Sequence, residues 1–258
     1  MSKTIRSIYP NKGVELAYKK RLQSMIYDMQ RSVVYWVTSA YRNNTPRVAQ
    51  LAEDATPSEK MNKVLNELGK RWIDTFEKWA PKIAEVYVTD LWKATDSAFR
   101  QALKSAGWTV EFKVTPAVRD ALNASVIENV NLIKSIPTTY FDQVNGIVMR
   151  SYTAGRDLAT MTKELNALYP KAKDRAELIA RDQSNKLNAT VNRTRRMELG
   201  ITEAIWMHSG GGKEPRQSHV AANGKKFNVE KGALIDGEWI QPGEKINCRC
   251  TSRAVLPI

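Results

Sequence analysis

The amino-acid sequence predicts a predominantly helical α+β protein. Before Gly200, apolar residues recur at steps of three and four over long stretches, which is the spacing of helices that bury one face. After Gly200, glycines become frequent and short runs alternate between apolar and polar residues, which indicates a small sheet. We therefore expect a long-helix N-terminal domain over residues 1–135 and a smaller α+β C-terminal domain with a short β-sheet over residues 136–258.

The first predicted helix runs from Gly13 to about Tyr41. Its apolar residues recur at helical steps, so they should line one buried face. The run RNNTPR should end the helix, because the residue before Pro46 is disfavoured in helical conformation. The residues of the expected buried face are Tyr18, Leu22, Met25, Met29, Val33, Trp36 and Ala40.

A second helix is predicted around Pro81, which should kink the helix or restart it at a first turn. Its stripe is interpreted as core-facing, with a partner-docking face as the alternative. The run GWTVEFKVTP, in which Trp108, Val110, Phe112 and Val114 alternate with other residues, predicts a short strand. The expected stripe consists of Trp72, Phe76, Trp79, Ile83, Val86 and Leu91.

Thr115 and Pro116 are typical of a helix start, and that helix should end near Ser135, where we place the domain boundary. Further helices are predicted at about 138–152, 157–169 and 173–199, the last closed by Gly200 as a C-terminal cap. The runs ITEAIWMH, GEWI and CRCTSRAVL should then supply the strands of the small sheet.

The chain has 258 residues, 42% of them hydrophobic, so it can form a core. Its formal net charge of +13 favours an acidic partner, either nucleic acid or an acidic protein surface, although a solvated mixed surface would also explain it. No apolar run approaches the roughly 20 residues of a membrane-spanning helix, so we expect no membrane association. The N-terminus lacks the apolar centre of a secretion signal, and two cysteines spaced C-x-C form no disulfide framework, so a reducing compartment is expected.

Polar residues follow one row of the predicted helix at 173–199. Asparagine is a poor helix former, so three of them in a single row call for an explanation. One interpretation is a hydrogen-bonding row that contacts a partner, nucleic acid or a loop of the protein itself; the alternative is internal scaffolding. The row consists of Arg181, Asn185, Asn188, Asn192 and Arg195.

All histidines and cysteines of the chain lie between His208 and Cys250. If Cys248 and Cys250 lie on a strand, their sulfurs point to one side, and His208 and His219 could complete a tetrahedral zinc site. Zinc is therefore the one cofactor that the sequence suggests. The alternative is a buried pair of free cysteines with a surface histidine, because C-x-C is not the usual zinc spacing. Nothing in the spacing specifies a Cys–His nucleophile, and SGGGK lacks the spacing of a phosphate-binding loop.

Four stretches occur in a recognisable order: LIARDQSNKLNATVNRTRRMELGI, IWMHSGGGKEPRQSH, NGKKF and PGEKINCRC. In this order they resemble the C-terminal domain of the phage Mu F-like head morphogenesis proteins, the minor head proteins also typified in phage SPP1. The resemblance covers about residues 136–258.

The resemblance implies a minor head protein of a tailed bacteriophage, associated with the portal vertex, that supports head assembly, DNA packaging or DNA delivery. It implies no established enzyme. The implied partners are the portal protein, the major capsid protein and packaged double-stranded DNA. The implied location is the virion, in the capsid interior near the portal vertex, after assembly in the bacterial cytoplasm.

Carried over residue by residue, the family pattern is matched in three places. The helix motif falls on Arg181, Asp182 and Asn185, and the next element on Arg216 and His219. The last motif falls on Asn247, Cys248, Arg249 and Cys250. The chain departs from many members at Ser209 to Gly212, where they have an acidic residue, and at Glu244 to Ile246, where they have a histidine. A metal site that used a histidine at the second position would need His208 in its place.

Our hypothesis is that the N-terminal helices attach the protein to portal or capsid, and that the C-terminal domain is a compact module held by its polar row and its His/Cys cluster. Two alternatives remain open. One is a Cys/His-based or toxin-like enzyme, and the other is a non-specific nucleic-acid-binding protein.

Overall fold

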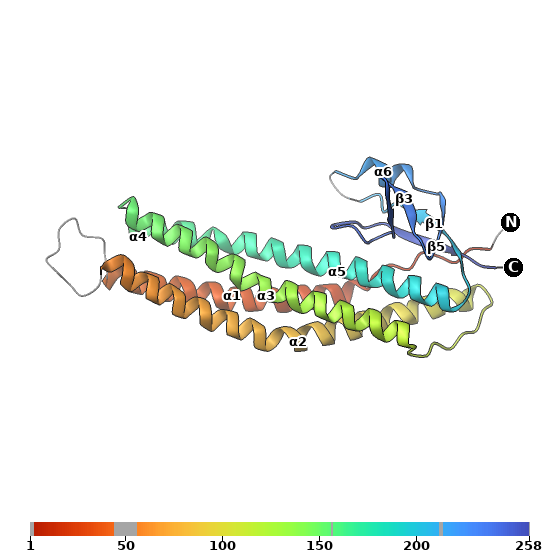
Figure 1. The fold of residues 1–258 in the computed structure, drawn as a ribbon, viewed down its shortest axis with the longest axis horizontal. Helices are drawn as coiled ribbons and strands as arrows, with labels where there is room; N and C mark the ends of the chain where they lie inside the picture. The colour runs from red at the N-terminus through yellow and green to blue at the C-terminus, as the bar shows by residue number, and fades with distance from the viewer. Residues whose placement is uncertain (1–2, 44–55, 156, 212–213, 258) are drawn as a thin grey trace. The chain divides into compact units, whose positions relative to one another are not determined.

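The computed structural model describes residues 3–43, 56–155, 157–211 and 214–257 (Figure 1). Long helices dominate and a few short antiparallel strands follow them, which confirms the predicted fold class. The helices are α1 (Lys12–Asn43), α2 (Pro57–Ser105), α3 (Pro116–Thr153), α4 (Leu158–Asn166), α5 (Leu168–Glu198) and α6 (Gln217–Ala221), and the strands are β1 (Glu203–Met207), β2 (Lys226–Asn228), β3 (Ala233–Ile235), β4 (Glu238–Ile240) and β5 (Thr251–Val255).

Internal contacts divide the chain into two compact units, neither of which is a continuous stretch. The first unit comprises Met1–Tyr18, Ala84–Ile127 and Leu178–Ile258, and the second comprises Lys19–Ile83 and Glu128–Glu177. Each unit therefore draws on both expected domains. The division of labour between residues 1–135 and 136–258 stays a prediction.

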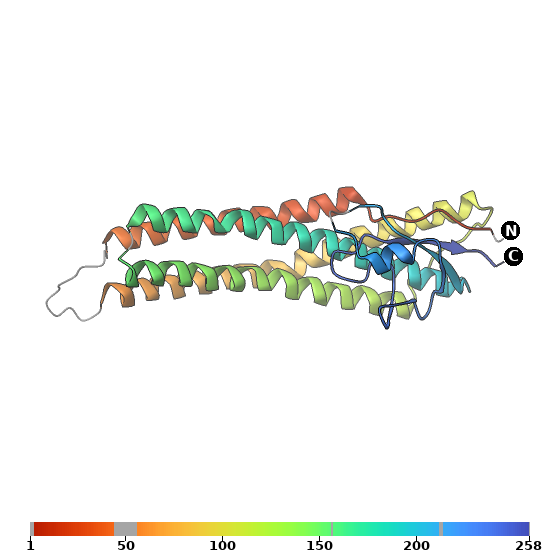
Figure 2. The same cartoon turned by 90° about the horizontal axis from the view of Figure 1, so that it is seen from above.

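The second unit is built from helices whose segments lie lengthwise beside one another (Figures 1 and 2). A buried polar contact sits in its apolar interior: Tyr140 donates a hydrogen bond to the side-chain oxygen of Gln30. The Gln30 amide donates in turn to the backbone carbonyl of Leu165, at 3.2 Å. This link fixes α1 against α3 and the end of α4, because buried polar groups are costly unless they are paired.

The buried faces of α1 and α2 differ in part from the expected stripes. Trp36 on α1 and Trp79 and Val86 on α2 are exposed. On α1 the buried apolar positions advance by four residues in five of six steps, so the buried stripe drifts around the helix and leaves Trp36 outside it. Those positions are Tyr18, Leu22, Ile26, Met29, Val33, Val37 and Tyr41.

Two prolines that were expected to interrupt helices lie inside them. α2 continues through Pro81, which is exposed, so water can bond the carbonyl group that the missing N–H leaves open. α3 continues through Pro137, so the helix end expected near Ser135 is wrong. Ile136 and Tyr140 are buried on either side of that proline, and their packing outweighs the local penalty. Residues 44–55, which include the expected stop at Pro46, lie outside the described residues.

The strand expected in GWTVEFKVTP is wrong. The segment between Gly107 and Pro116 pairs with no strand among the described residues. Its alternation is nevertheless real, because Trp108, Val110 and Phe112 pack one after another against a buried apolar cluster. Phe112 stacks on Phe99 with ring centroids 5.7 Å apart. The segment is thus an extended strap held by side chains, and alternation alone does not distinguish it from a strand.

Helix α3 begins as expected, since the Thr115 hydroxyl accepts a hydrogen bond from the backbone N–H of Val118, at 3.3 Å. The helices expected at 157–169 and 173–199 correspond to α4 and α5, with α5 beginning at Leu168. α5 ends at Glu198 and is closed by Gly200 as predicted: this glycine has a φ of +68°, and the N–H of Ile201 donates back to the carbonyl of Arg196, at 2.9 Å. That pair of features is the Schellman cap.

The first unit carries both small sheets. The three-stranded sheet has the order β2-β1-β5, antiparallel throughout, and β3 pairs with β4 as a hairpin. Near the N-terminus, Thr4 bridges to Val255, which adds a short pairing to the free edge of β5. Strands were expected in ITEAIWMH, GEWI and CRCTSRAVL, and each of these runs contains one. In the helices that the structure describes, no stretch is long and apolar enough to cross a membrane.

Candidate functional site

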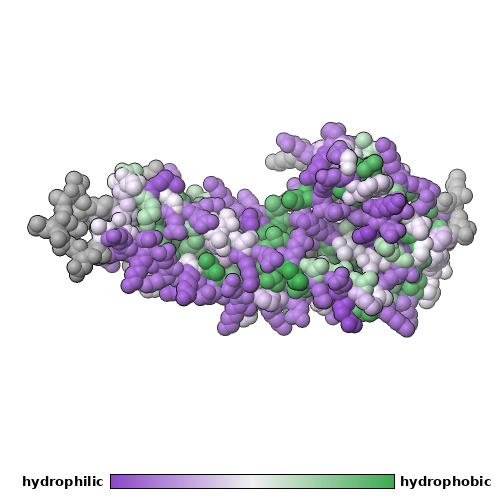
Figure 3. Space-filling model, in the orientation of Figure 1, coloured by the Kyte–Doolittle hydropathy of each residue, from purple (hydrophilic) through white to green (hydrophobic). Residues whose placement is uncertain are grey.

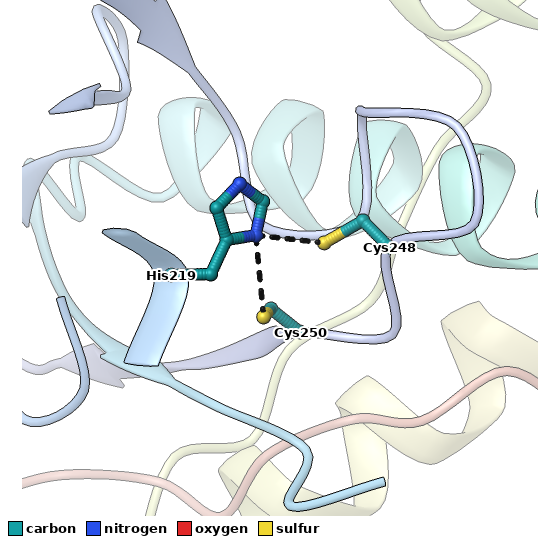
Figure 4. Close-up of side chains that lie close together, drawn as sticks. All are labelled: His219, Cys248 and Cys250. Carbon is teal, nitrogen blue, oxygen red and sulfur yellow. Dashed lines mark hydrogen bonds between the residues drawn. The ribbon is translucent and has the colours of Figure 1, made fainter. Parts of the chain in front are cut away.

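Three metal-binding side chains converge in the first unit, namely His219, Cys248 and Cys250. All three are buried, at 4%, 3% and 7% exposed. The Nδ1 atom of His219 lies 3.4 Å from the sulfur of Cys248 and 3.7 Å from the sulfur of Cys250. Figure 4 shows both sulfurs directed at this one nitrogen, while the second ring nitrogen points away from them.

The three side chains come from two segments. His219 lies on the short helix α6, and both cysteines lie in the loop that precedes β5. The expectation that the cysteines lie on a strand is therefore wrong, because pairing with β1 begins only at Thr251. Their sulfurs nevertheless point to one place, since the loop curls around them.

Residues that match the family motifs hold this loop. Arg216 donates a hydrogen bond to the carbonyl of Ile246, at 3.0 Å. Asp182 on α5 accepts one from the backbone N–H of Asn247, at 2.7 Å. Asn247 itself has a φ of +60°, a conformation that asparagine tolerates better than most residues. The motif residues Asp182, Arg216 and Asn247 therefore position the cysteines.

Close packing against α5 also requires a glycine. Gly243 has a φ of +93°, and a Cβ atom added there would lie 3.1 Å from the backbone oxygen of Asn185. A side chain at this position would push the loop away from the helix. The second residue of the run PGEKINCRC is thus the glycine that lets the loop approach α5.

The side chains of Cys248 and Cys250 change each other's pKa. The side chain of Cys250 donates a hydrogen bond to Cys248, and the backbone N–H groups of Cys250 and Gly243 also face its sulfur; together they lower the pKa of Cys248 to about 5. The same hydrogen bond and burial raise the pKa of Cys250 well above its usual value. Of the two thiols, Cys248 is therefore the more acidic, and the thiolate is the form of cysteine that binds metals.

The expected fourth ligand, His208, is not part of this cluster. Among the described residues, the group of metal-binding atoms that lie close together contains His219, Cys248 and Cys250 alone. The Nδ1 atom of His208 instead accepts a hydrogen bond from the backbone N–H of Gly210, at 3.1 Å. His208 does line the same cavity as the cluster, a space of about 630 Å³.

The cavity carries further motif residues. Arg249 is exposed on its wall, and Arg216 and Asn247 line it as well. Two of the three matched motifs, those at Arg216 and His219 and at residues 247–250, therefore meet around one cavity. Arg249 has no hydrogen-bond partner among the described residues, so its charge is available to whatever enters this space.

The polar row of α5 lies elsewhere in the unit and is internal at its C-terminal end. Arg195 is 1% exposed and forms a two-pronged pair with Asp96, with N···O distances of 2.9 and 2.6 Å. It also donates to the carbonyl of Lys113, at 2.7 Å, and to Glu198, at 2.8 Å. Its guanidinium carbon lies 4.6 Å from the ring centre of Phe112. Arg195 thus joins α2, the strap and α5.

The asparagines of the row also bond within the protein. Asn188 donates to the carbonyl of Ile8, at 2.9 Å, and accepts from the hydroxyl of Thr95, at 3.2 Å. Asn192 donates to the carbonyl of Asn188, at 2.7 Å. These contacts support the scaffolding interpretation for Asn188, Asn192 and Arg195, because buried groups that bond internally are not available to a partner. Arg181 and Asn185, at the start of the row, are half-buried.

Two residues of this scaffold were not found from the sequence. Asp96 lies 99 residues before its partner Arg195, and no local pattern marks it. Arg196 is buried beside Arg195 and donates to the hydroxyl and the carbonyl of Ser252, at 2.6 and 3.1 Å. Burial lowers the pKa of Arg196 to about 10, which still leaves it charged at neutral pH. The adjacent arginines in NRTRRMEL were the one available signal.

Comparison with known proteins agrees with the family resemblance that the order of the sequence motifs indicated. Residues 142–253 match the family model described as Phage Mu protein F like protein. An uncharacterized protein of Haemophilus influenzae is 37% identical over 145 residues, which is 55% of this chain and 31% of the relative. The aligned part is thus less than a third of that relative's length. No solved structure gives a significant match.

The matched range contains α4, all of α5, α6, the three-stranded sheet up to Arg253 and the whole His/Cys cluster. It also begins within α3, close to the start that the sequence motifs indicated. The resemblance noted in the sequence is therefore confirmed over residues 142–253, which are similar to the phage Mu protein F-like family.

Proposed function

We propose that this chain is a head morphogenesis protein of a tailed bacteriophage, and more specifically a minor head protein that associates with the portal vertex and supports head assembly, DNA packaging or DNA delivery. The observation that carries the proposal is the match of residues 142–253 to the Mu protein F-like family. Because the proposed role is structural, we expect the buried contacts of α5 to stabilise the fold rather than to take part in catalysis.

The second unit offers a surface of the kind that proteins use for contacts. On α1, Tyr27, Tyr35 and Trp36 are exposed and line a cavity of about 940 Å³ together with Arg31 and Arg42. Tyrosine, tryptophan and arginine are the residues that contribute most to binding at protein interfaces. This aromatic surface, defined by Tyr27, Tyr35 and Trp36, is our candidate for the attachment to portal or capsid.

The charge of the chain suits a place beside packaged DNA. A net charge of +13 can neutralise phosphate groups without any reading of base sequence. The face drawn in Figure 3 is mainly hydrophilic, with apolar side chains only in small patches. We expect this hydrophilic surface to lie next to DNA. The aromatic surface is expected to attach the protein to portal or capsid.

The first experiment is quantitative mass spectrometry of purified, DNA-filled particles of the phage that encodes the chain. A minor head protein should be present in a few copies per portal ring. Complete absence from particles would contradict the proposal and would favour an enzyme or an assembly factor that does not remain in the virion.

The second experiment measures capture of the full-length chain by purified portal and, separately, by major capsid protein. Trp36→Ala should weaken capture by more than tenfold if the aromatic surface is the contact, since interface tryptophans commonly contribute more than about 1.4 kcal/mol. Trp79→Ala is the matched control, because Trp79 is 50% exposed against 47% for Trp36 but lies outside the cavity. Equal losses in both variants, or none in either, would rule out this surface.

Nucleic-acid binding can be distinguished in the same preparation. A general nucleic-acid-binding protein should bind any duplex with an affinity that falls steeply as salt is raised, and Trp36→Ala should not change the salt slope. Tight, salt-sensitive DNA binding with no capture by portal or capsid would favour that alternative over the proposed role.

A further inference from the structure

The cluster of His219, Cys248 and Cys250 has the geometry of three corners of a tetrahedral zinc site. Tetrahedral zinc binds sulfur at about 2.3 Å and histidine nitrogen at about 2.0–2.1 Å, which places a nitrogen and a sulfur ligand about 3.6 Å apart. The observed distances from Nδ1 to the two sulfurs are 3.4 and 3.7 Å. All three ligand atoms also lie within 4.8 Å of one another, as ligands of a single ion must.

We propose that His219, Cys248 and Cys250 bind one zinc ion through three protein ligands, with the fourth coordination position facing the neighbouring cavity. The sequence predicted four zinc ligands. The proposed site keeps three of them and leaves out His208. This site does not depend on any role in a phage head, and its failure would leave the proposed function untouched.

The chemistry of the ligands favours zinc over harder cations. Two thiolates and one imidazole suit zinc, whereas magnesium and calcium prefer oxygen ligands.

The surroundings hold the ligands in place. Trp206 is fully buried on β1, and its indole packs perpendicular to the imidazole of His219 with ring centres 5.3 Å apart. The cysteines themselves belong to the apolar cluster that contains Trp206 and Phe227. The open side of the site is the cavity of about 630 Å³, on whose wall lie Arg249 and Glu214. Three protein ligands with one open position are typical of zinc sites that hold a water or another exchangeable ligand.

The proposed ion would connect two separate segments of the chain. His219 lies on α6 and the cysteines lie in the loop before β5, so zinc would close the chain between them into one fixed unit. A bound metal stabilises the folded state by its own binding free energy, because the unfolded chain offers no ready-made site. We therefore expect zinc to order α6 and this loop.

The test uses the full-length chain, purified without a histidine tag and analysed for metal by mass spectrometry. We expect about one zinc ion per chain. After chelation, titration with Co²⁺ should produce the visible absorption of tetrahedral cobalt together with thiolate-to-cobalt charge transfer. X-ray absorption of the zinc form should show two sulfur ligands at about 2.3 Å and two lighter ligands at about 2.0 Å.

Variants then separate the ligands from their neighbour. Cys248→Ser, Cys250→Ser and His219→Ala should each lower the affinity for Co²⁺ by at least about tenfold, in line with the loss of a direct ligand. His208→Ala should bind with wild-type affinity. Circular dichroism of each variant at low temperature checks that it is folded, so that a loss of metal is not a loss of structure.

Three outcomes would overturn the proposal. If the folded wild-type chain takes up neither Zn²⁺ nor Co²⁺ under reducing conditions, the cluster is a buried Cys–His network without a metal. If His208→Ala loses the metal as completely as Cys248→Ser does, the site has four protein ligands and no open position. Retention of metal by both serine variants would likewise place the ion elsewhere.

Discussion

The first unit buries polar side chains in two regions that differ in how those side chains are paired. Along α5, Asn188 and Arg195 meet groups of the protein at ordinary hydrogen-bond distances. In the His/Cys cluster, two thiols and an imidazole instead point at a common centre, and the sulfurs lie 3.4 and 3.7 Å from the ring nitrogen. One region is closed by the protein itself, and the other has the arrangement of a site that a further atom completes.

This difference explains why similar-looking sequence features have different roles. A row of Asn and Arg on a helix suggested contact with a partner, yet most of its members bond to backbone carbonyls and to a distant aspartate. The C-x-C pair was the weaker zinc signal in spacing, yet its sulfurs converge with a histidine. The role of a buried polar group is therefore best judged by whether the protein itself supplies its hydrogen-bond partners.

The strongest way to break the α5 region is to remove the carboxylate of Asp96. Asp96→Ala should lower the free energy of unfolding by about 3–5 kcal/mol, because it leaves the buried Arg195 guanidinium without its main counter-charge. Urea unfolding followed by circular dichroism measures this change.

The control is an exposed pair in the same unit. Lys226 and Glu203 lie 3.0 Å apart and both are about half exposed, so Glu203→Ala should cost no more than about 1 kcal/mol. If Asp96→Ala were no more destabilising than Glu203→Ala, Arg195 would not depend on its carboxylate and the region would not be the closed scaffold described above.

The sequence was sufficient for features that depend on local pattern. Helical periodicity predicted α1, α2 and α5, and Gly200 marked the end of α5 because a left-handed residue is needed there. The clustering of all His and Cys residues in one stretch predicted that some of them would meet. Such signals need no knowledge of distant parts of the chain.

Other features depend on contacts between distant residues. Pro137 would end an isolated helix, but buried neighbours on both sides carry α3 through it. The strap around Phe112 alternates like a strand, yet it packs by side chains onto an apolar cluster. That the cluster contains three metal-binding side chains rather than four depends on where the loop places His208, which spacing does not specify. Tertiary packing determines these features, and no local pattern in a single sequence reveals that packing.

A smaller change tests whether the asparagines act as scaffold. Asn188→Ala should cost about 1–2 kcal/mol, because Thr95 loses its acceptor while the carbonyl of Ile8 keeps a second donor, the hydroxyl of Thr251, at 3.2 Å. Combining it with Thr251→Val should cost more than the sum of the two, since that carbonyl then has neither side-chain donor.

Asn185→Ala is the matched control for this prediction. Asn185 belongs to the same row but is only half-buried, so its replacement should change the free energy of unfolding by no more than about 0.5 kcal/mol. Equal costs at Asn185 and Asn188, measured by urea unfolding, would mean that the contacts of Asn188 with Thr95 and Ile8 do not contribute to stability and that the asparagines are not scaffold.

The smallest expected effect lies where the two regions meet. Asp182 is on α5, but its carboxylate accepts the backbone N–H of Asn247, the residue before Cys248. Asp182→Ala should cost about 1 kcal/mol, because Asn247 is exposed and water can replace the lost acceptor. The affinity for Co²⁺ should nevertheless fall by about tenfold, as it does when residues that orient metal ligands are removed. Asp182→Asn keeps an acceptor oxygen and should preserve both values. If Asp182→Ala lowered stability but left metal affinity unchanged, the loop would hold its cysteines without help from α5, and the scaffold and the metal centre would be independent.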